Sequence, residues 1–354
     1  MSKIKVLIVD DSAYSRQAIR KALEHNSNIE VVGISIDGID AMAKTIMFKP
    51  DLITLDLEMP GMDGFTFLRW LMKKKPTPVI VVSSYHDPKT VFKALEFGAA
   101  DFIAKPQKIA PLEFQKMQDE LLDKVRIMKH LSMDRLSKSL KLMEEDKPER
   151  KSLEIAGGGI EAIAIGSSTG GPNALKIIMS RLPADFPASI VISQHMPKGF
   201  TASFAERLNG ISNLHVKEAE DGDVIERGKV FLCPSGFHMQ IKKRDRDVIA
   251  NIKKPKSSDK YIPSIDIMMS SAAEVFGCKT MGILLTGMGN DGVSGMMEIK
   301  SKGGYTIAES EDTAVVFGMP SVVIKMGSVG KVLPISEIPD EMINLTRKRD
   351  RGEN

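Results

Sequence analysis

Short apolar runs alternate with longer segments of helical periodicity, and this alternation constrains the fold more than any other feature of the sequence. Five such runs precede residue 108: Val6–Val9, Ile29–Ile34, Leu52–Leu55, Val79–Val82 and Phe102–Ala104. Strands that are separated by helices pair in parallel, and the helices then cover both faces of the sheet. We therefore predict an α/β fold with a five-stranded, doubly wound parallel sheet in this part of the chain.

The alternation resumes after residue 158 and predicts a second sheet. The expected strands are Ile160–Ile165, Ser189–Ile192, Val230–Leu232, Thr280–Leu285 and Tyr305–Ala308. The stretch 236–252 fits a pair of antiparallel strands better. We predict a second, larger α/β domain that is doubly wound and mostly parallel.

A charged segment separates the two halves. Between Lys108 and Lys151, 20 of 44 residues are Asp, Glu, Lys or Arg, and the apolar residues recur at helical spacing. The run ends at Pro148 and at the triplet Gly157–Gly159, which offer nothing to pack. At about 150 residues per domain, 354 residues also suggest two domains. We place a first domain at 1–124, a partly helical linker at 125–157, a second domain at 158–345 and a tail at 346–354.

Bulk composition excludes several classes of protein. The net charge of +3 gives no basic stripe for nucleic acid, and no apolar run approaches the length of a membrane span. The two cysteines, Cys233 and Cys278, form neither a disulfide framework nor a zinc motif. We expect a cytoplasmic protein that neither inserts into membranes nor binds nucleic acid.

Polar residues follow the strands of the first predicted sheet, where ligands of parallel sheets bind. They are Asp10, Asp11, Asp56, Ser83 and Lys105. Converging carboxylates suit a Mg²⁺ ion, with Asp11 and Asp56 as its direct ligands. Asp56 is then the candidate acceptor of a phosphoryl group, Lys105 a cation for the transferred oxygens and Ser83 a hydroxyl donor.

The alternative is structural: Asp10 and Asp11 cap the following helix, and Lys105-Pro106 is a surface turn. Taken together, however, the aspartate pair, Asp56 with the run 58–64 behind it, Ser83 and Lys105 stand at successive strand ends. This set closely resembles a response-regulator receiver domain over residues 1–125. The resemblance implies phosphotransfer to Asp56 from a histidine kinase, with Mg²⁺ held by Asp11, Asp56 and the carbonyl of Glu58.

A serine stands at the first strand-to-helix turn of the second domain. Gly166-x-Ser168-x-Gly170 has the form of a nucleophile elbow, and Pro172 suits the first turn of the helix that follows. Ser168 is the candidate nucleophile. A glycine-rich turn of this kind also cradles phosphates, so a nucleotide-binding oxidoreductase is an alternative, although the dinucleotide spacing is absent.

A nucleophilic serine needs a base and an orienting acid. His195 follows the strand Ser189–Ile192 and therefore shares the sheet edge of Ser168, and Asp291 lies in the glycine-rich loop after the strand Thr280–Leu285. Asp266 and Asp221 are competing candidates for the acid. The structural alternative is a helix cap for Asp266 and a turn for Asp221. In an α/β-hydrolase the order along the chain is serine, acid, histidine. With that order the base would be His215 or His238.

The motifs 166–171, 194–197, 263–266, 286–292 and 317–320 are together similar to the chemotaxis protein-glutamate methylesterase domain. The resemblance spans 158–345 and implies a serine hydrolase that demethylates chemoreceptor glutamyl esters and deamidates certain glutamines. It implies the triad Ser168, His195 and Asp291, oxyanion donors near Thr169 and Met288, and no cofactor for the ester chemistry. The expected partners are methyl-accepting chemotaxis receptors and a histidine kinase, with the protein as a monomer.

A receiver stands before this domain in the chain. We hypothesise that phosphorylation of Asp56 relieves an occlusion of Ser168.

The alternative function is a regulator with a nucleic-acid-binding output domain. Residues 242–260 carry eight Lys or Arg against three Asp, but Pro255 and the strand-like Val248–Ile252 favour a solvated hairpin.

Overall fold

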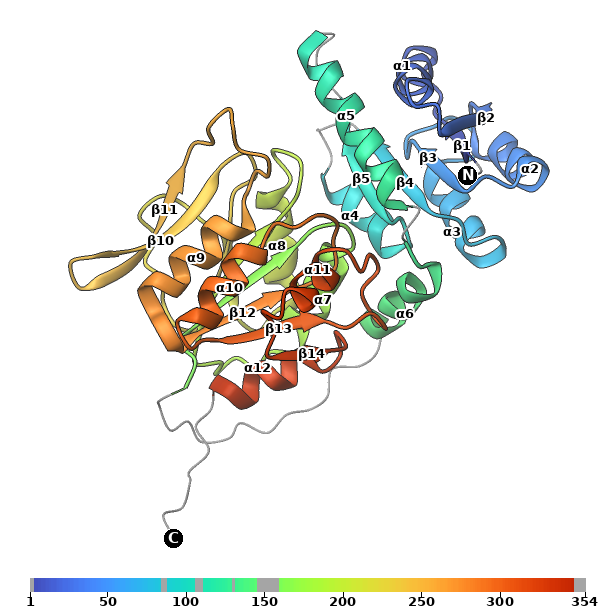
Figure 1. Cartoon of the computed structure of the whole chain (residues 1–354). Coiled ribbons are helices and arrows are strands. Elements are labelled where there is room, and N and C mark those ends of the chain that lie inside the picture. Colours follow the sequence, from blue (N-terminus) through green and yellow to red (C-terminus); the bar gives the residue numbers. More distant parts are fainter. Residues whose placement is uncertain (1–2, 84–87, 106–110, 129–130, 145–158, 347–354) are drawn as a thin grey trace. The chain divides into compact units, whose positions relative to one another are not determined.

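A computed structural model of the chain describes residues 3–83, 88–105, 111–128, 131–144 and 159–346 (Figure 1). The chain divides into two compact units, residues 1–140 and 141–354. Each is an α/β unit built on a parallel sheet, as predicted. The end of the predicted linker, from residue 145, and the tail after residue 346 lie outside the described residues.

The first unit has five parallel strands in the order β2-β1-β3-β4-β5. Its elements are β1 (Ile4–Val9), α1 (Ala13–Glu24), β2 (Ile29–Ser35), α2 (Gly38–Phe48), β3 (Leu52–Leu55), α3 (Gly64–Lys74), β4 (Val79–Ser83), α4 (Pro88–Glu96), β5 (Asp101–Ala104), α5 (Pro111–Met128) and α6 (Met133–Glu144). All five strands match the predicted apolar runs. β3 and β4 are buried along their whole length, which is why nearly all of their residues are apolar.

Helix α5 continues past the predicted boundary at residue 124. It packs beside α1 and against β5, and Lys124 Nζ lies 2.8 Å from Asp101 Oδ1 at the start of that strand. The helical part of the predicted linker therefore consists of the end of α5 and of α6.

The second unit has seven parallel strands in the order β14-β13-β12-β6-β7-β9-β8. Its elements are β6 (Ala162–Ser167), α7 (Gly171–Arg181), β7 (Ser189–Gln194), α8 (Thr201–Ile211), β8 (His215–Glu218), β9 (Lys229–Leu232), β10 (His238–Arg244), β11 (Asp247–Lys253), α9 (Ile265–Phe276), a 3-10 turn (Gly277–Lys279), β12 (Thr280–Leu284), α10 (Val293–Ser301), β13 (Tyr305–Glu309), α11 (Met319–Lys325), β14 (Lys331–Leu333) and α12 (Ile338–Thr346).

The sequence pattern did not predict two strands of this sheet. β8 and β14 are its edge strands, only four and three residues long, and each has exposed or half-buried positions. Such short edge strands lack an apolar run. The antiparallel pair predicted near 236–252 is confirmed as the hairpin of β10 and β11, which accounts for the basic residues there.

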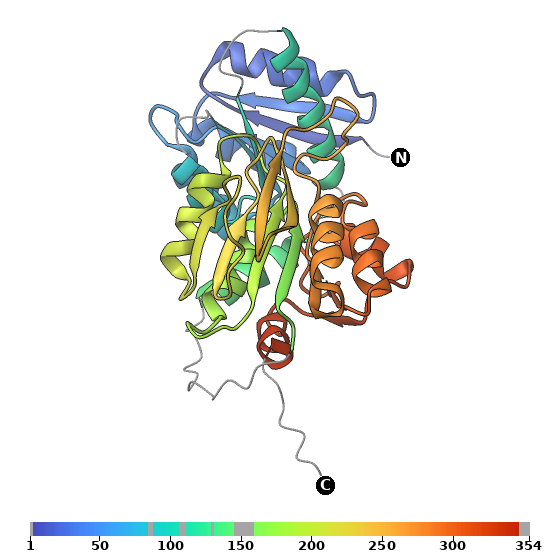
Figure 2. The same ribbon diagram turned by 90° about the vertical axis from the view of Figure 1, so that its left-hand side faces the viewer.

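Helices cover both faces of the larger sheet (Figure 2). Helix α9 packs against α10, β6 and the hairpin strand β10, while α7 packs against α8 and α12. A hydrophobic core cluster includes residues of α9 and α10, with Met268, Met269 and Met296 fully buried. No helix within the described ranges is long and apolar enough to cross a membrane.

The turn between β3 and α3 allows no side chain at Gly64. A Cβ there would lie 2.2 Å from the carbonyl oxygen of Asp56 and 2.7 Å from the Cα of Leu57. Both atoms are backbone, so neither can rotate away.

We expect Gly64→Ala to lower the free energy of unfolding of the first unit by about 2 kcal/mol, because the strand end must shift. Gly210→Ala in α8 is the matched control: nothing lies within 4 Å of its Cβ, so we expect a gain of about 0.5 kcal/mol from helix propensity. Denaturant unfolding, followed for each unit's transition, measures both. A Gly64→Ala protein as stable as the wild type would contradict the close approach.

Candidate active site

Three carboxylates meet at the carboxyl edge of the first sheet. One ligand oxygen from each of Asp10, Asp11 and Asp56 lies within 4.8 Å of the others. Asp10 and Asp56 are buried, at 0% and 7% exposure, and Asp11 is exposed. Oxygen donors of this kind at this separation suit a hard divalent cation such as Mg²⁺, so these residues fit the implied metal.

Lys105 joins two of these carboxylates. Its Nζ lies 2.8 Å from Asp10 Oδ2 and 2.5 Å from Asp56 Oδ2. Burial, together with the charge of Asp10, raises the pKa of Asp56, although Lys105 acts to lower it. Burial by itself lowers the pKa of Lys105, but Asp10 and Asp56 outweigh it and raise that pKa. The pocket thus holds a cation beside the candidate phosphoryl acceptor.

The alternative in which the aspartates cap helix α1 is wrong. Ser12 is the N-cap, with its Oγ accepting from the N–H of Ser15. Asp10 instead accepts from the N–H of Ser12 at 2.9 Å and from the Ser15 hydroxyl at 2.6 Å. These bonds hold its carboxylate at the sheet edge.

The other two predicted pocket residues are placed at neighbouring strand ends. Ser83 is the buried last residue of β4, and Glu58 is exposed. The backbone N–H of Glu58 donates to Asp56 Oδ1 at 3.2 Å, which places the peptide of Glu58 next to the acceptor. Pro106, of the predicted Lys105-Pro106 turn, lies outside the described residues.

Ser168 stands directly after β6 and before the N-cap of α7, Gly170, which has φ of 80°. Its N–H donates to the carbonyl of Thr286 at 3.0 Å. A Cβ at Gly287 would lie 2.7 Å from Ser168 Cβ. The loop after β12 therefore touches the serine because residue 287 has no side chain.

Gln194, which sequence reasoning passed over, ties two strand ends together. Its Oε1 accepts from the Ser167 hydroxyl at 2.6 Å, and its Nε2 donates to the carbonyls of Ser168 and His195 at 3.0 and 2.8 Å. The sequence signal is an apolar strand that ends in an amide side chain. In the structure this amide is buried and needs hydrogen-bond partners.

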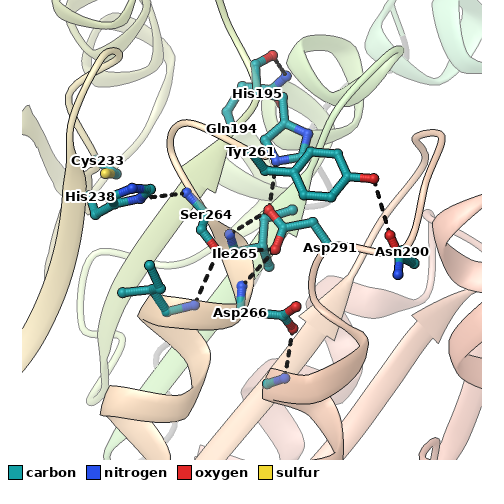
Figure 3. A network of polar contacts seen from close by, with 12 residues as sticks. Gln194, His195, Cys233, His238, Tyr261, Ser264, Ile265, Asp266, Asn290 and Asp291 are labelled. Carbon is teal, nitrogen blue, oxygen red and sulfur yellow. Dashed lines mark hydrogen bonds and ion pairs between the residues drawn. The ribbon is translucent and has the colours of Figure 1, made fainter. Parts of the chain in front are cut away.

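His195 and Asp291 are brought together. His195 Nε2 lies 2.8 Å from Asp291 Oδ2 (Figure 3), and the same carboxylate accepts from the N–H groups of Ile265 at 2.7 Å and Asp266 at 3.0 Å. Burial raises the pKa of Asp291, but its bonds with His195 and these N–H groups outweigh burial and lower that pKa. The acid is therefore held as an anion beside the imidazole.

The competing acids have other partners. Asp266 Oδ1 accepts from the N–H of Gly295 at 2.8 Å and so joins α9 to α10. It does not cap its own helix, the structural alternative for this residue, because Ser264 is the N-cap. Asp221 accepts from the N–H of Ile252 at 2.8 Å. Of the alternative bases, His238 is buried against Asp259 and His215 is exposed on β8.

The predicted oxyanion donors flank the serine. Thr169 is buried, and its carbonyl accepts from the Thr286 hydroxyl at 2.9 Å. Met288 follows Gly287, and a Cβ at Gly318 would lie 3.0 Å from Met288 Cα. Both backbones thus lie at the turn that carries Ser168.

Tyr261 is a second residue that sequence reasoning missed. Its ring lies parallel to the imidazole of His195, with centroids 5.3 Å apart and 3° between planes, and its hydroxyl donates to Asn290 Oδ1 at 3.1 Å. The imidazole is therefore packed on one face by an aromatic ring.

Comparison with known proteins agrees with this arrangement. Residues 163–342 match the CheB methylesterase family, and residues 6–115 match the response regulator receiver domain. The protein-glutamate methylesterase/protein-glutamine glutaminase 3 of Geobacter sulfurreducens is 45% identical to this chain, and the alignment covers 97% of this chain and 97% of that protein. That of Pyrococcus horikoshii is 41% identical over 96% of this chain and 93% of its own. The crystal structure of the Thermotoga maritima CheB methylesterase catalytic domain is 44% identical, with a TM-score of 0.52, and matches 53% of this chain and all of that one.

The chain belongs to the CheB methylesterase family. The predicted combination of a receiver and a methylesterase domain is confirmed. The alternatives of a nucleic-acid-binding output domain and of an oxidoreductase are set aside, because the family match covers the second unit from β6 to α12.

This CheB family member also buries a carboxylate next to the site. Glu309, at the end of β13, is 1% exposed. Its Oε2 accepts from the N–H of Thr286 at 2.8 Å, and its Oε1 accepts from the Thr313 hydroxyl at 3.0 Å. Neither donor carries a charge, so burial raises the pKa of Glu309 to about 7.

We expect Glu309→Gln to change how stability depends on pH. The folded pKa of about 7 exceeds the ordinary 4.5, so the contribution of the protonated carboxyl is present below 4.5 and lost as pH rises to 7. Relative to the Gln variant, the wild-type catalytic domain should lose about 3 kcal/mol of unfolding free energy across that range. Denaturant unfolding at several pH values measures the difference, and two curves that stay parallel would refute it.

Proposed function

We propose that this protein hydrolyses the methyl esters of glutamyl residues on methyl-accepting chemotaxis receptors, releases methanol, and deamidates particular receptor glutamines. The relatives that match it over nearly its whole length carry both activities in their names. The observation that carries the proposal is the His195–Asp291 pair at the strand edge that also presents Ser168. A serine, an imidazole and a carboxylate at one edge are the parts of an acyl-transfer site.

In the first step Ser168 Oγ attacks the γ-carbonyl carbon of the ester. Because His195 Nε2 is engaged by Asp291, Nδ1 is the atom left to take the serine proton. The anionic Asp291 stabilises the imidazolium that forms. The proton then passes to the departing methoxide, and methanol leaves an acyl-enzyme.

The oxyanion of the tetrahedral intermediate needs donors at the serine turn. We assign this role to the backbone N–H groups of Thr169 and Met288, and one such donor is commonly worth about 3 kcal/mol of barrier. Water then attacks the acyl-enzyme with His195 again as base, which restores the serine and leaves a receptor carboxylate. Glutamine deamidation follows the same steps with ammonia as the leaving group, and neither reaction requires a cofactor.

The receiver supplies control by phosphorylation. We assign Asp56 as the phosphoryl acceptor, supplied by a chemotaxis histidine kinase. When bound, Mg²⁺ neutralises the acidic pocket, with Asp11, Asp56 and the Glu58 carbonyl as its ligands. Lys105 stands where it can meet the transferred oxygens, and Ser83 offers its hydroxyl from the end of β4. The proposal takes the protein as a monomer and as cytoplasmic. Its two free cysteines suit the reducing conditions of the cytoplasm.

Ser168→Ala should reduce methanol release from methylated receptor membranes by roughly 10³-fold or more, because no other hydroxyl takes its place in the attack. Ser193→Ala is the matched control: Ser193 is a buried serine on neighbouring β7, and its loss should leave the rate unchanged. Methanol counted with receptors labelled in their methyl esters gives the rates. Retained activity in Ser168→Ala would end the assignment of the nucleophile.

Asp56→Asn should abolish the rise in esterase rate that a phosphodonor and Mg²⁺ produce, since the amide cannot form an acyl phosphate. The exposed Asp123 on α5 provides the control Asp123→Asn, which should respond as the wild type does. Phosphate incorporation and methanol release are followed in the same samples. An Asn variant that still incorporates phosphate and is still stimulated would place the acceptor elsewhere.

A further inference from the structure

A buried histidine that takes no part in the proposed chemistry anchors the segment in front of helix α9. His238, at the start of β10, has a side chain 4% exposed. Its Nε2 lies 3.0 Å from Asp259 Oδ2. Figure 3 shows the second contact, in which its Nδ1 lies 3.0 Å from the backbone nitrogen of Ser264. The imidazole thus joins both ends of residues 259–264, which we call the strap.

The two contacts define the tautomer of this imidazole. The backbone nitrogen of Ser264 can only donate, so Nδ1 must accept and carries no proton. A neutral imidazole then has its proton on Nε2, where the carboxylate of Asp259 accepts it. The arrangement therefore requires the neutral Nε2–H form. A proton on Nδ1 would face the Ser264 N–H and break that bond.

The residue that His238 holds begins the set of donors around Asp291. Four groups donate to that carboxylate: His195 Nε2, the Ser264 hydroxyl at 3.1 Å and the N–H groups of Ile265 and Asp266. Three of the four come from consecutive residues at the start of α9. A shift of the Ser264 backbone therefore moves most of the support for Asp291 at once.

The strap also contacts the imidazole of His195 itself. Tyr261 lies within the strap and packs flat on that ring. Displacement of the strap would therefore loosen the base through its stacking partner and the acid through its hydrogen bonds.

We propose that His238, in its Nε2–H tautomer, is a positioning residue that orients Asp291 and His195 through the strap. The proposal rests on the proposed function for its kinetic readout, and it adds a role for a residue outside the three that carry the reaction. His238 does not touch the substrate. It acts through the backbone of Ser264, so a misplacement of the pair by a fraction of an ångström should lower the rate of the chemical step.

Two substitutions separate the contacts of this imidazole. In His238→Asn the side-chain oxygen lies where Nδ1 lies and still accepts from Ser264, whereas in His238→Gln an amide N–H₂ replaces Nε2–H and the acceptor is lost. We expect the Gln variant of the full chain to lose about 10- to 100-fold in kcat with little change in KM, and the Asn variant to remain within about threefold of wild type by the same geometric argument. His215→Gln, on exposed β8, is the control and should leave both constants unchanged.

Equal losses in the Asn and Gln variants, or no loss in either, would overturn the proposal. Thermal unfolding establishes whether each variant is folded. Should His238→Gln fail to fold, His238→Leu replaces it: leucine offers no acceptor to the Ser264 N–H, so kcat should fall, and an unchanged kcat would count against the proposal.

A spectroscopic measurement on the unaltered protein tests the geometry without any substrate. The ¹⁵N spectrum of its imidazoles at neutral pH should show His238 as the Nε2–H tautomer, and an Nδ1–H or doubly protonated ring would overturn the proposal. This result is independent of the esterase assay. A failure of Ser168→Ala to lose activity would remove the proposed function, whereas a wrong tautomer would remove only the role of His238.

Discussion

Parallel pairing of three neighbouring strands is the constraint on which the catalytic unit depends. β6 pairs with β7 and with β12, in a register that sets Ser167 beside Gln194 and Gly166 beside Leu284. Ser168 is the residue after β6, and His195 is the residue after β7. The loop after β12 supplies Gly287 and Asp291. Strand alignment thus brings residues more than a hundred positions apart, such as Ser168 and Gly287, to the same edge of the sheet.

Burying carboxylates at such an edge is costly, and the protein meets the cost in three different ways. Asp56 and Asp10 share the ammonium of Lys105. Asp291 is surrounded by four hydrogen-bond donors and remains an anion. Glu309 has two uncharged donors, and burial raises its pKa instead. The charge state of each group follows from its donors, and Asp291, the proposed catalytic acid, has four of them.

Much of this could be predicted from the sequence, for a definite reason. Central strands are buried on both faces, so their apolar runs stand out, and polar residues at their ends mark both sites. The edge strands β8 and β14 are half exposed and left no such run. Tyr261 and His238 could not be foreseen as supports, since their hydrogen bonds join residues 29 and 26 positions apart. The structural alternative for Asp266, a helix cap, is wrong because Ser264 occupies that position.

Two serines stand side by side at the turn after β6, yet they differ sharply in chemical availability. The hydroxyl of Ser167 is fully buried and donates to Gln194, whereas Ser168 is partly exposed. Selectivity between them is therefore a property of the packing rather than of intrinsic reactivity. A covalent inhibitor aimed at serine meets one hydroxyl here, and its neighbour is protected by the same amide that holds the two strand ends together.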